Sequence, residues 1–328
     1  MRKIIVIMAG ALVLSVAAWY FWPKEKKVFL SPEAPYLVVV KPLEKYSFPE
    51  LRQRLFTPDG IWVEADKFYY WVSGKKVSGQ IHLPAQAGVP VGSGPFPVVI
   101  MIRGYVDREE YQPGVGTRRA AEVLAQNGFI TLAPDFLGFA ESDMPPVNVL
   151  EDRFWRPIEV LQLIASVKNL PQADTDKISI WGHSNGGQIA LSVLEISGQD
   201  YPTTLWAPVS KPFPYSILYY TDEHDDFGKA LRKVVAGFEA QYDSDEFSIH
   251  EYYHWINAPV QIHQGTADDS VPVKWSQDLA KALEDKDKEV ELNVYPGADH
   301  NLKSPSTALG IITWDTAVQK DILWFNTH

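Results

Sequence analysis

The chain of 328 residues contains no cysteine. This absence excludes disulfides, zinc–thiolate sites, a cysteine nucleophile and the lipidated cysteine of a bacterial lipoprotein anchor. Basic residues are also fewer than acidic ones: the chain has 30 Lys and Arg and 41 Asp and Glu, which gives a formal net charge of −11. A nucleic-acid partner is therefore not expected, because phosphate binding needs a basic face. The remaining composition is that of a globular protein, with 46% hydrophobic and 22% charged residues.

The first 27 residues differ from the rest. Residues 4–22 are uncharged and mostly apolar, and basic residues lie on both sides of them. As a helix they would span roughly 28 Å, about the thickness of the hydrocarbon core. We predict that residues 1–27 form a transmembrane anchor, or else a signal peptide cleaved near Val16-Ala17-Ala18. We then expect residues 28–328 to lie outside the cytoplasm, held at the membrane or secreted.

Beyond this segment the residue pattern indicates an α/β protein with a sheet that begins antiparallel. Short runs rich in β-branched and aromatic residues come first, separated by turns, at 36–40, 61–64, 68–72 and 77–82. Apolar strands then alternate with helices to the end: strands at 98–102, 129–133, 178–181, 203–206, 260–263 and 290–295, and helices at about 118–127, 150–169, 186–196, 275–284 and 309–325. This alternation predicts a mostly parallel central sheet with helices on both faces.

One long segment interrupts this alternation. Residues 211–258 separate two predicted strands and are rich in aromatic and acidic side chains. An insertion of this length in a compact sheet is typical of a cap over a binding site. A solvated surface segment is the alternative.

A motif for nucleophilic catalysis lies at Gly182-His183-Ser184-Asn185-Gly186, between the predicted strand 178–181 and a helix. This G-x-S-x-G pattern in a strand–turn–helix context predicts a nucleophile elbow. Glycines are needed there because the turn is sharp and strained. Ser184 is therefore the candidate nucleophile, and a tight turn with a capping serine is the alternative.

A serine hydroxyl needs a base, and in this motif's fold the partners follow in the order Ser, acid, His. Among the eight histidines, His300 follows the last strand and a turn and precedes the last helix, so we predict that it is the general base. Asp268 and Asp269 compete as the acid that accepts a hydrogen bond from the imidazole. The aspartate that is not the catalytic acid would stabilise the turn through side-chain hydrogen bonds to the backbone.

The oxyanion hole needs two backbone N–H donors. The residue after the nucleophile, Asn185, is expected to supply one. The loop after strand 98–102 reads Arg103-Gly104-Tyr105, and the N–H of Tyr105 is the second candidate. An ordinary strand-ending turn is the alternative.

From about residue 98 onward the chain resembles the catalytic domain of the prolyl oligopeptidase family of serine peptidases and the related dienelactone-hydrolase-like esterases. The residues that carry the resemblance are 182–187 and 265–272. The second segment reads as the family's Gly-x-x-Asp-x-x-Val-Pro, which favours Asp268 over Asp269. The resemblance implies an α/β-hydrolase fold and a triad of Ser184, Asp268 and His300.

Three departures from the family bear on specificity. Arg103 stands where family members often have histidine before the glycine, and Gln264 stands where histidine is usual before Gly265. The peptidases of this family also carry a large N-terminal β-propeller. Only about 70 residues follow the first 27 before the catalytic part, too few for two propeller blades of about 40–45 residues each.

The sequence thus predicts a serine hydrolase that needs no cofactor and acts through an acyl-enzyme. The family resemblance favours a peptidase for short peptides, while the missing propeller favours a carboxylesterase for small or carbohydrate-linked esters. Two other hypotheses stay open. His250-Glu251-Tyr252-Tyr253-His254 matches the H-E-x-x-H pattern of zinc hydrolases, without a third ligand that the sequence identifies. The second hypothesis is an inactive, membrane-anchored binding module.

Overall fold

The computed structural model describes residues 41–328, except for 87–88, 91, 93, 222–225 and 305–312. The predicted anchor or signal segment at 1–27 and the predicted strand at 36–40 therefore lie outside the described residues. Within the described part of the chain, no helix is both long and apolar enough to cross a bilayer.

A nine-stranded mixed sheet organises these residues, with the strand order β1-β2-β3-β7-β6-β8-β9-β10-β11. The first three strands pair antiparallel with one another, and β3 pairs antiparallel with β7. From β7 to β11 all neighbours are parallel. The predicted antiparallel start and parallel centre are both present. The strands are β1 (Ile61–Glu64), β2 (Lys67–Val72), β3 (Lys75–His82), β6 (Phe96–Ile102), β7 (Ile130–Pro134), β8 (Ala173–His183), β9 (Thr203–Trp206), β10 (Val260–Gly265) and β11 (Val290–Tyr295), and β4 (Ala85–Gln86) with β5 (Val89–Pro90) forms a separate ribbon.

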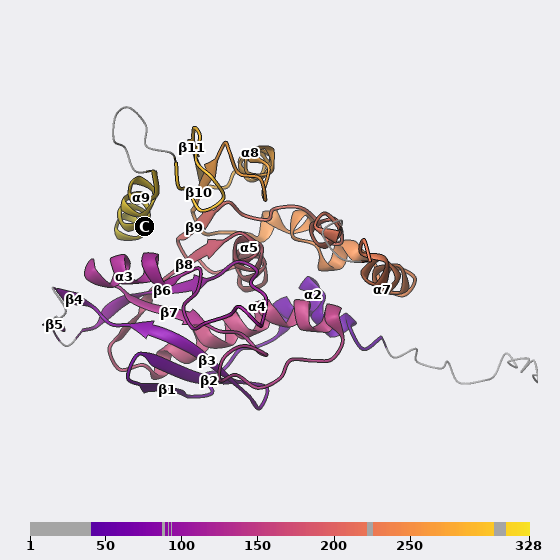
Figure 1. Cartoon of the computed structure of the whole chain (residues 1–328). Coiled ribbons are helices and arrows are strands. Elements are labelled where there is room, and N and C mark those ends of the chain that lie inside the picture. The colour runs from indigo at the N-terminus through magenta and orange to yellow at the C-terminus, as the bar shows by residue number, and fades with distance from the viewer. Residues whose placement is uncertain (1–40, 87–88, 91, 93, 222–225, 305–312) are drawn as a thin grey trace, which may run out of the picture. The chain divides into compact units, whose positions relative to one another are not determined.

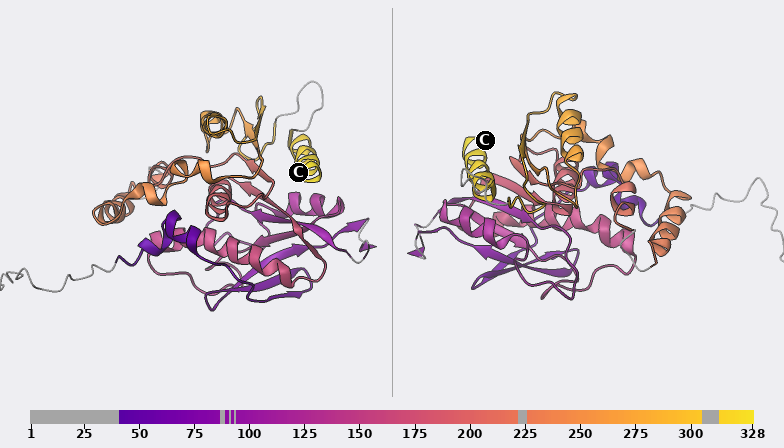
Figure 2. Two further views of the ribbon diagram at one scale, coloured as in Figure 1. Left: turned by 180° about the vertical axis from the view of Figure 1, so that it is seen from behind. Right: turned by 45° about the horizontal axis from the view of Figure 1, so that its top comes forward.

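Helices cover both faces of the sheet (Figures 1 and 2). On one side lie α3 (Arg118–Gln126) and α9 (Thr313–Thr327), and on the other α2 (Phe48–Gln53), α4 (Val149–Ser166), α5 (Asn185–Ser197) and α8 (Val273–Glu284). Strand β6 shows how the two layers form. Val98, Ile100 and Ile102 belong to the core under α4 and α5, whereas Val99 and Met101 belong to the core under α3 and α9. Successive side chains of a strand point to opposite faces, so an unbroken apolar run serves both cores.

The two helices that bear on the site have clear end signals. Helix α4 begins where the Asn148 side chain accepts the N–H groups of Leu150 and Glu151. It continues into a 3-10 turn, η2 (Val167–Asn169). Helix α5 ends at Gly198, whose φ of +59° closes the helix with a left-handed cap.

The predicted cap segment lies between β9 and β10. It contains α6 (Tyr215–Leu218), α7 (Lys229–Glu239) and the 3-10 turns η4 (Ser244–Phe247), η5 (Ile249–Glu251) and η6 (Tyr253–Trp255), while η1 (Glu44–Tyr46) lies near the start of the described chain. Aromatic rings fix the cap to α4: the ring centroid of Phe154 lies 5.3 Å from that of Phe213 and 4.8 Å from that of Phe247. Figure 1 shows α7 at the outer end of this segment. These contacts pack Phe213 and η4 of the segment against α4, whereas most residues of α7 are exposed.

Candidate active site

Ser184 lies in a strained turn between β8 and α5, with φ +54° and ψ −120°. A non-glycine residue rarely adopts a positive φ, and the surrounding structure must hold it there. Close approach explains the glycines around it. A Cβ atom on Gly186 would lie 2.1 Å from the carbonyl oxygen of Ile102, and one on Gly187 would lie 2.7 Å from Cβ of Pro208. This is the geometry that a nucleophile elbow requires.

Asp268 and His300 form a partly buried hydrogen-bonded pair. His300 Nδ1 lies 2.9 Å from Asp268 Oδ2, and the side chains are 17% and 0% exposed, respectively. The other carboxylate oxygen accepts the N–H groups of Ser270 and Val271 at 2.9 and 2.8 Å. Asp269, in contrast, is exposed and accepts a hydrogen bond from the Ser270 hydroxyl. Of the two aspartates that the sequence left open, the structure brings Asp268 to His300.

Gln264 holds the Asp268 carboxylate from the strand side. Its amide donates to Asp268 Oδ2 at 2.8 Å and to the Val271 carbonyl at 3.2 Å, while its own oxygen accepts the Ser276 hydroxyl at 2.7 Å. Burial by itself would raise the pKa of Asp268, but the hydrogen bonds from His300, Val271 and Gln264 outweigh it and lower that pKa. The carboxylate is therefore ionised at neutral pH and can stabilise an imidazolium.

His183, in the elbow, contacts the loop that carries His300. Its Nε2 lies 3.0 Å from the backbone oxygen of His300, and the two ring centroids are 4.7 Å apart. Burial first, and then the charge on His300, lower the pKa of His183 to about 4. The ring is thus neutral near pH 7, so Nε2–H can donate to that carbonyl. Sequence reasoning gave His183 no role beyond its place in the motif.

Ser184 precedes Asn185 in the chain and follows His183, which contacts the His300 backbone oxygen. Within the described residues, no hydrogen bond joins the Ser184 hydroxyl to His300. Catalytic hydrogen bonds are often long without substrate and tighten when it binds. The structure therefore unites Asp268 and His300, and it connects His300 to the elbow through His183, the residue before Ser184.

The two candidate oxyanion donors line one cavity. The chain after β6 passes directly against the nucleophile, because a Cβ atom on Gly104 would lie 3.0 Å from Cβ of Ser184. Asn185 is the first residue of α5, where N–H groups have no acceptor within the helix. Tyr105 and Asn185 both contribute to the wall of a cavity of about 450 Å³. Two N–H groups at these positions could donate to the carbonyl oxygen of an acyl group bound to Ser184.

Arg103 supports this loop where relatives often have histidine. Its guanidinium is buried, lies 4.2 Å from the ring centre of Phe139 and 4.6 Å from that of Tyr111, and donates to the carbonyls of Gly104 and Asp135 at 2.9 and 3.1 Å. Burial lowers the pKa of Arg103 below its ordinary value. The side chain thereby fixes the turn at Gly104, which the sequence pattern alone does not reveal.

The 450 Å³ cavity is enclosed by the loop after β6, by α4 and α5, and by the cap. The cap contributes Ile217 of α6 and Leu231 of α7, which ties the insertion to the site. A volume of this size suits a small ligand rather than an extended chain. The other lining residues are Arg103, Gly104, Val106, Asp107, Arg108, Glu109, Phe136, Phe139, Val149, Leu150, Asp152, Arg153, Arg156 and Ile189.

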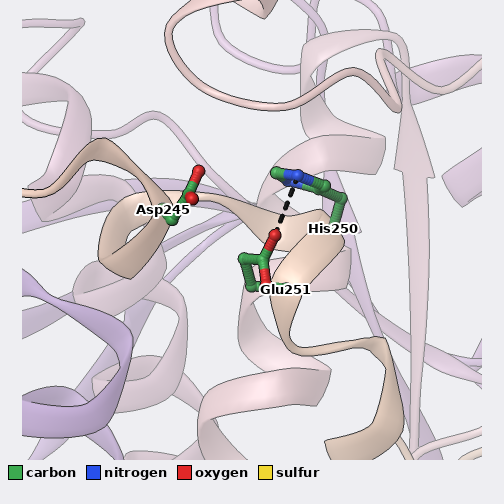
Figure 3. Close-up of side chains that lie close together, drawn as sticks. All are labelled: Asp245, His250 and Glu251. Carbon is green, nitrogen blue, oxygen red and sulfur yellow. Dashed lines mark ion pairs between the residues drawn. The ribbon is translucent and has the colours of Figure 1, made fainter.

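The zinc hypothesis is wrong in the form that the sequence predicted. The H-E-x-x-H pattern needs both histidines on one face of a helix, but His250 and Glu251 lie in η5 and His254 lies in η6. Ligand atoms of Asp245, His250 and Glu251 lie within 4.8 Å of one another, without His254. Figure 3 shows the ion pair in this trio, where His250 Nε2 lies 3.0 Å from Glu251 Oε1. None of the three lines the cavity that Tyr105 and Asn185 share.

Comparison with known proteins identifies the family. Residues 116–313, more than half of the chain, match the model of the prolyl oligopeptidase family. The chain belongs to this family. Curated relatives of this family member include the uncharacterized peptidase YtmA of Bacillus subtilis, 26% identical over 79% of this chain and 91% of that protein. A putative carboxymethylenebutenolidase of Escherichia coli O157:H7 is 27% identical over 67% of this chain and 72% of that protein.

Solved structures show the same fold. A puromycin-hydrolyzing peptidase of Mycobacterium tuberculosis superposes with a TM-score of 0.57 at 18% identity, over 77% of this chain and 37% of that one. Esterase 2 of Thermogutta terrifontis, with propionate bound, gives 0.55 at 17% identity over 84% of this chain and 96% of that one. The predicted α/β-hydrolase fold is confirmed. Family membership makes this protein a serine hydrolase, a peptidase or an esterase.

Proposed function

We propose that this family member is a serine peptidase for short peptides, with Ser184 as nucleophile, His300 as general base and Asp268 as the acid that orients it. The observation that carries the proposal is the hydrogen bond between Asp268 and His300, together with an elbow serine held at a positive φ whose neighbour His183 contacts His300. Few structural demands other than catalysis account for a strained serine next to an ionised carboxylate–imidazole pair.

In the proposed reaction, Ser184 Oγ attacks the scissile carbonyl carbon while His300 Nε2 takes the hydroxyl proton. The backbone N–H groups of Tyr105 and Asn185 stabilise the negative charge on the carbonyl oxygen. His300 then gives its proton to the leaving amine, which departs and leaves an acyl-enzyme. Water attacks the ester carbonyl, His300 accepts a proton from that water and returns it to Ser184, and the acid product leaves.

The size of the cavity and the family likeness support a short peptide as substrate. The cavity beside Asn185 has a volume of about 450 Å³ and is lined in part by Ile217 and Leu231 of the cap. The family model describes peptidases by its name, and YtmA carries the same designation. Within the described residues before β6, the chain forms a three-stranded antiparallel unit and short helices rather than propeller blades.

A carboxylesterase is the second candidate, and one observation favours it. The putative carboxymethylenebutenolidase of Escherichia coli, 27% identical, matches this chain over 72% of its own length. Both candidates use the same acyl-enzyme mechanism, so they differ only in the leaving group. An ester is the easier substrate for such a site, because its alkoxide departs more readily than an amine.

Labelling of the full chain with a fluorophosphonate probe tests the mechanism. The wild type is expected to react, the Ser184→Ala variant is expected to stay unlabelled, and Ser197→Ala at the far end of the same helix serves as the control that should still react. Turnover of dipeptide and tripeptide anilides against matched 4-nitrophenyl esters then separates peptidase from esterase. A folded wild-type protein that neither reacts nor turns over any of these substrates would remove the serine mechanism.

A further inference from the structure

Four arginines of the described chain line the cavity beside Asn185: Arg103, Arg108, Arg153 and Arg156. The partners of each guanidinium group decide whether it can bind a substrate. Their partners differ, and the difference separates three structural arginines from one that is available to a ligand.

Two of the four are paired with a carboxylate, and the third, Arg103, is held by carbonyls and aromatic rings, with its Nε left without a partner within the described residues. Arg156 forms ion pairs with Asp152 at 2.6 Å and with Glu159 at 3.2 Å. Arg108 lies 3.7 Å from the same Asp152. Arg103 lies between aromatic rings and donates to two carbonyls of its own surroundings. These side chains hold α4 and the loop after β6 together.

Arg153 has polar but uncharged partners. Its Nη2 donates to the Gln188 side chain of α5 and, at 3.3 Å, to the Ser216 hydroxyl of the cap. Within the described residues no carboxylate is paired with it. Burial lowers the pKa of Arg153 to about 10, so the guanidinium is still charged at neutral pH. Arg153 is partly buried, and a partly desolvated cation without a counter-charge is unfavourable, so an anionic ligand would relieve that penalty.

Arg153 lies in the same cavity as a proposed oxyanion donor. It lines the same cavity as Asn185, the proposed oxyanion donor, and Gln188 lies three residues farther along α5. Gln188 and Ser216 both accept from Nη2, and within the described residues no carboxylate is bonded to Nη1 or Nε. A planar guanidinium in a fixed position suits bidentate binding of a carboxylate.

We propose that Arg153 binds a free carboxylate of the substrate, so that the protein selects substrates with an anionic group near the scissile bond. This rests on the proposed function. In a short peptide the group is the terminal carboxylate, and in an ester it is the free acid of a dicarboxylic monoester. A single negative charge is favoured over a phosphate dianion, because Asp107, Glu109 and Asp152 line the same cavity.

Matched substrate pairs test the inference. Mono-4-nitrophenyl esters of dicarboxylic acids of increasing length are compared with their methyl-capped, uncharged counterparts. The wild type is expected to prefer the charged member, and Arg153→Gln is expected to lower kcat/KM for it about 10- to 100-fold while changing the uncharged member little. Arg153→Lys keeps the charge without the planar fork and should retain part of the preference. Arg108→Gln, in the same cavity, is the matched control and should retain it.

The outcomes separate this inference from the proposed function. A wild type that hydrolyses uncharged esters and disfavours charged ones overturns the role of Arg153 while the serine mechanism stands. An equal loss on both members in Arg153→Gln, with an unchanged melting temperature, also overturns it, because the residue would then act on the nucleophile and not on the charge. Absence of turnover together with absence of fluorophosphonate labelling overturns the proposed function and the inference with it.

Discussion

Two fully buried carboxylates, one in the loop after β10 and one in α5, behave in opposite ways. Asp268 accepts hydrogen bonds from His300, from the Gln264 amide and from two backbone N–H groups. Glu195 in α5 is equally inaccessible, and neither of its carboxylate oxygens has a hydrogen-bond partner within the described residues. Donors lower the pKa of Asp268, whereas burial raises the pKa of Glu195 well above its ordinary value. Burial alone therefore does not set the charge of an acid; the donors around it do.

The surroundings of Glu195 make the contrast sharper. The guanidinium of Arg52 reaches this residue, but it donates to the backbone carbonyl and not to the carboxylate. The same side chain lies 4.6 Å from the ring centre of Trp255. Glu195 is consequently a neutral acid in an apolar layer, and Asp268 is an ionised acid in a polar loop.

The largest expected effect comes from removing the charge of Asp268. Asp268→Asn keeps the shape but no longer favours the His300 tautomer that can accept the serine proton. We expect kcat to fall about 10⁴-fold with little change in substrate affinity. Steady-state kinetics on a 4-nitrophenyl ester measures it. Asp269→Asn, one residue farther along, is the matched control and should stay within about threefold of wild type. Reversed results would transfer the acid role to Asp269.

Gln264 offers a smaller effect on the same loop. Gln264→Ala removes one of the donors that hold Asp268 and leaves the Ser276 hydroxyl without its acceptor. We expect kcat to fall about tenfold and the free energy of unfolding to fall by about 1–3 kcal/mol. Gln264→His, the residue usual in the family, should restore most of the activity. Gln261→Ala, on the same strand, is the control, and an equal activity loss there would argue against a role specific to Gln264.

The sequence predicted the fold and the three proposed triad residues because their signals are local. Mostly apolar runs of residues identify β6 and β7 in place, and the glycines around Ser184 mark the elbow without any tertiary information. The limits shifted by a few residues: the strand predicted at 129–133 is Ile130–Pro134, and the helix predicted at 150–169 ends in a 3-10 turn. Helix α2 was not predicted at all, since its six residues are too few for a periodic pattern.

The supporting residues could not be found in this way. The bond from Gln264 to Asp268, the contact of Arg103 with Phe139 and the neutral surroundings of Arg153 depend on which side chains the fold brings together. A departure from a family motif was the one available signal for Gln264 and Arg103. For Arg153 there was none, because a charged residue on an amphipathic helix usually faces solvent.

His183 provides a third buried group, with one partner, for the comparison. Its folded-state pKa is about 4 against an ordinary value of 6.5, so the unfolded chain takes up a proton first as the pH falls. Its contribution to stability is therefore present above pH 6.5 and is lost between there and about pH 4, by roughly 1.4 kcal/mol per pH unit. Urea unfolding across this interval measures the slope. His183→Asn should reduce it, and the exposed His254→Asn should leave it unchanged.

The smallest expected effect on activity, and the opposite sign in stability, belongs to Glu195. Because its folded-state pKa is raised, the unfolded chain ionises first as the pH rises, and stability falls by roughly 1.4 kcal/mol per pH unit above about pH 4.3. Glu195→Met removes the acid at similar volume, so we expect a variant that is more stable than wild type, by a margin that grows from acid to neutral pH, with kcat unchanged. Chemical unfolding at several pH values, paired with ester turnover, measures both. A margin that shrank toward neutral pH would mean that Glu195 is ionised in the fold and has a cationic partner, and the contrast with Asp268 would then disappear.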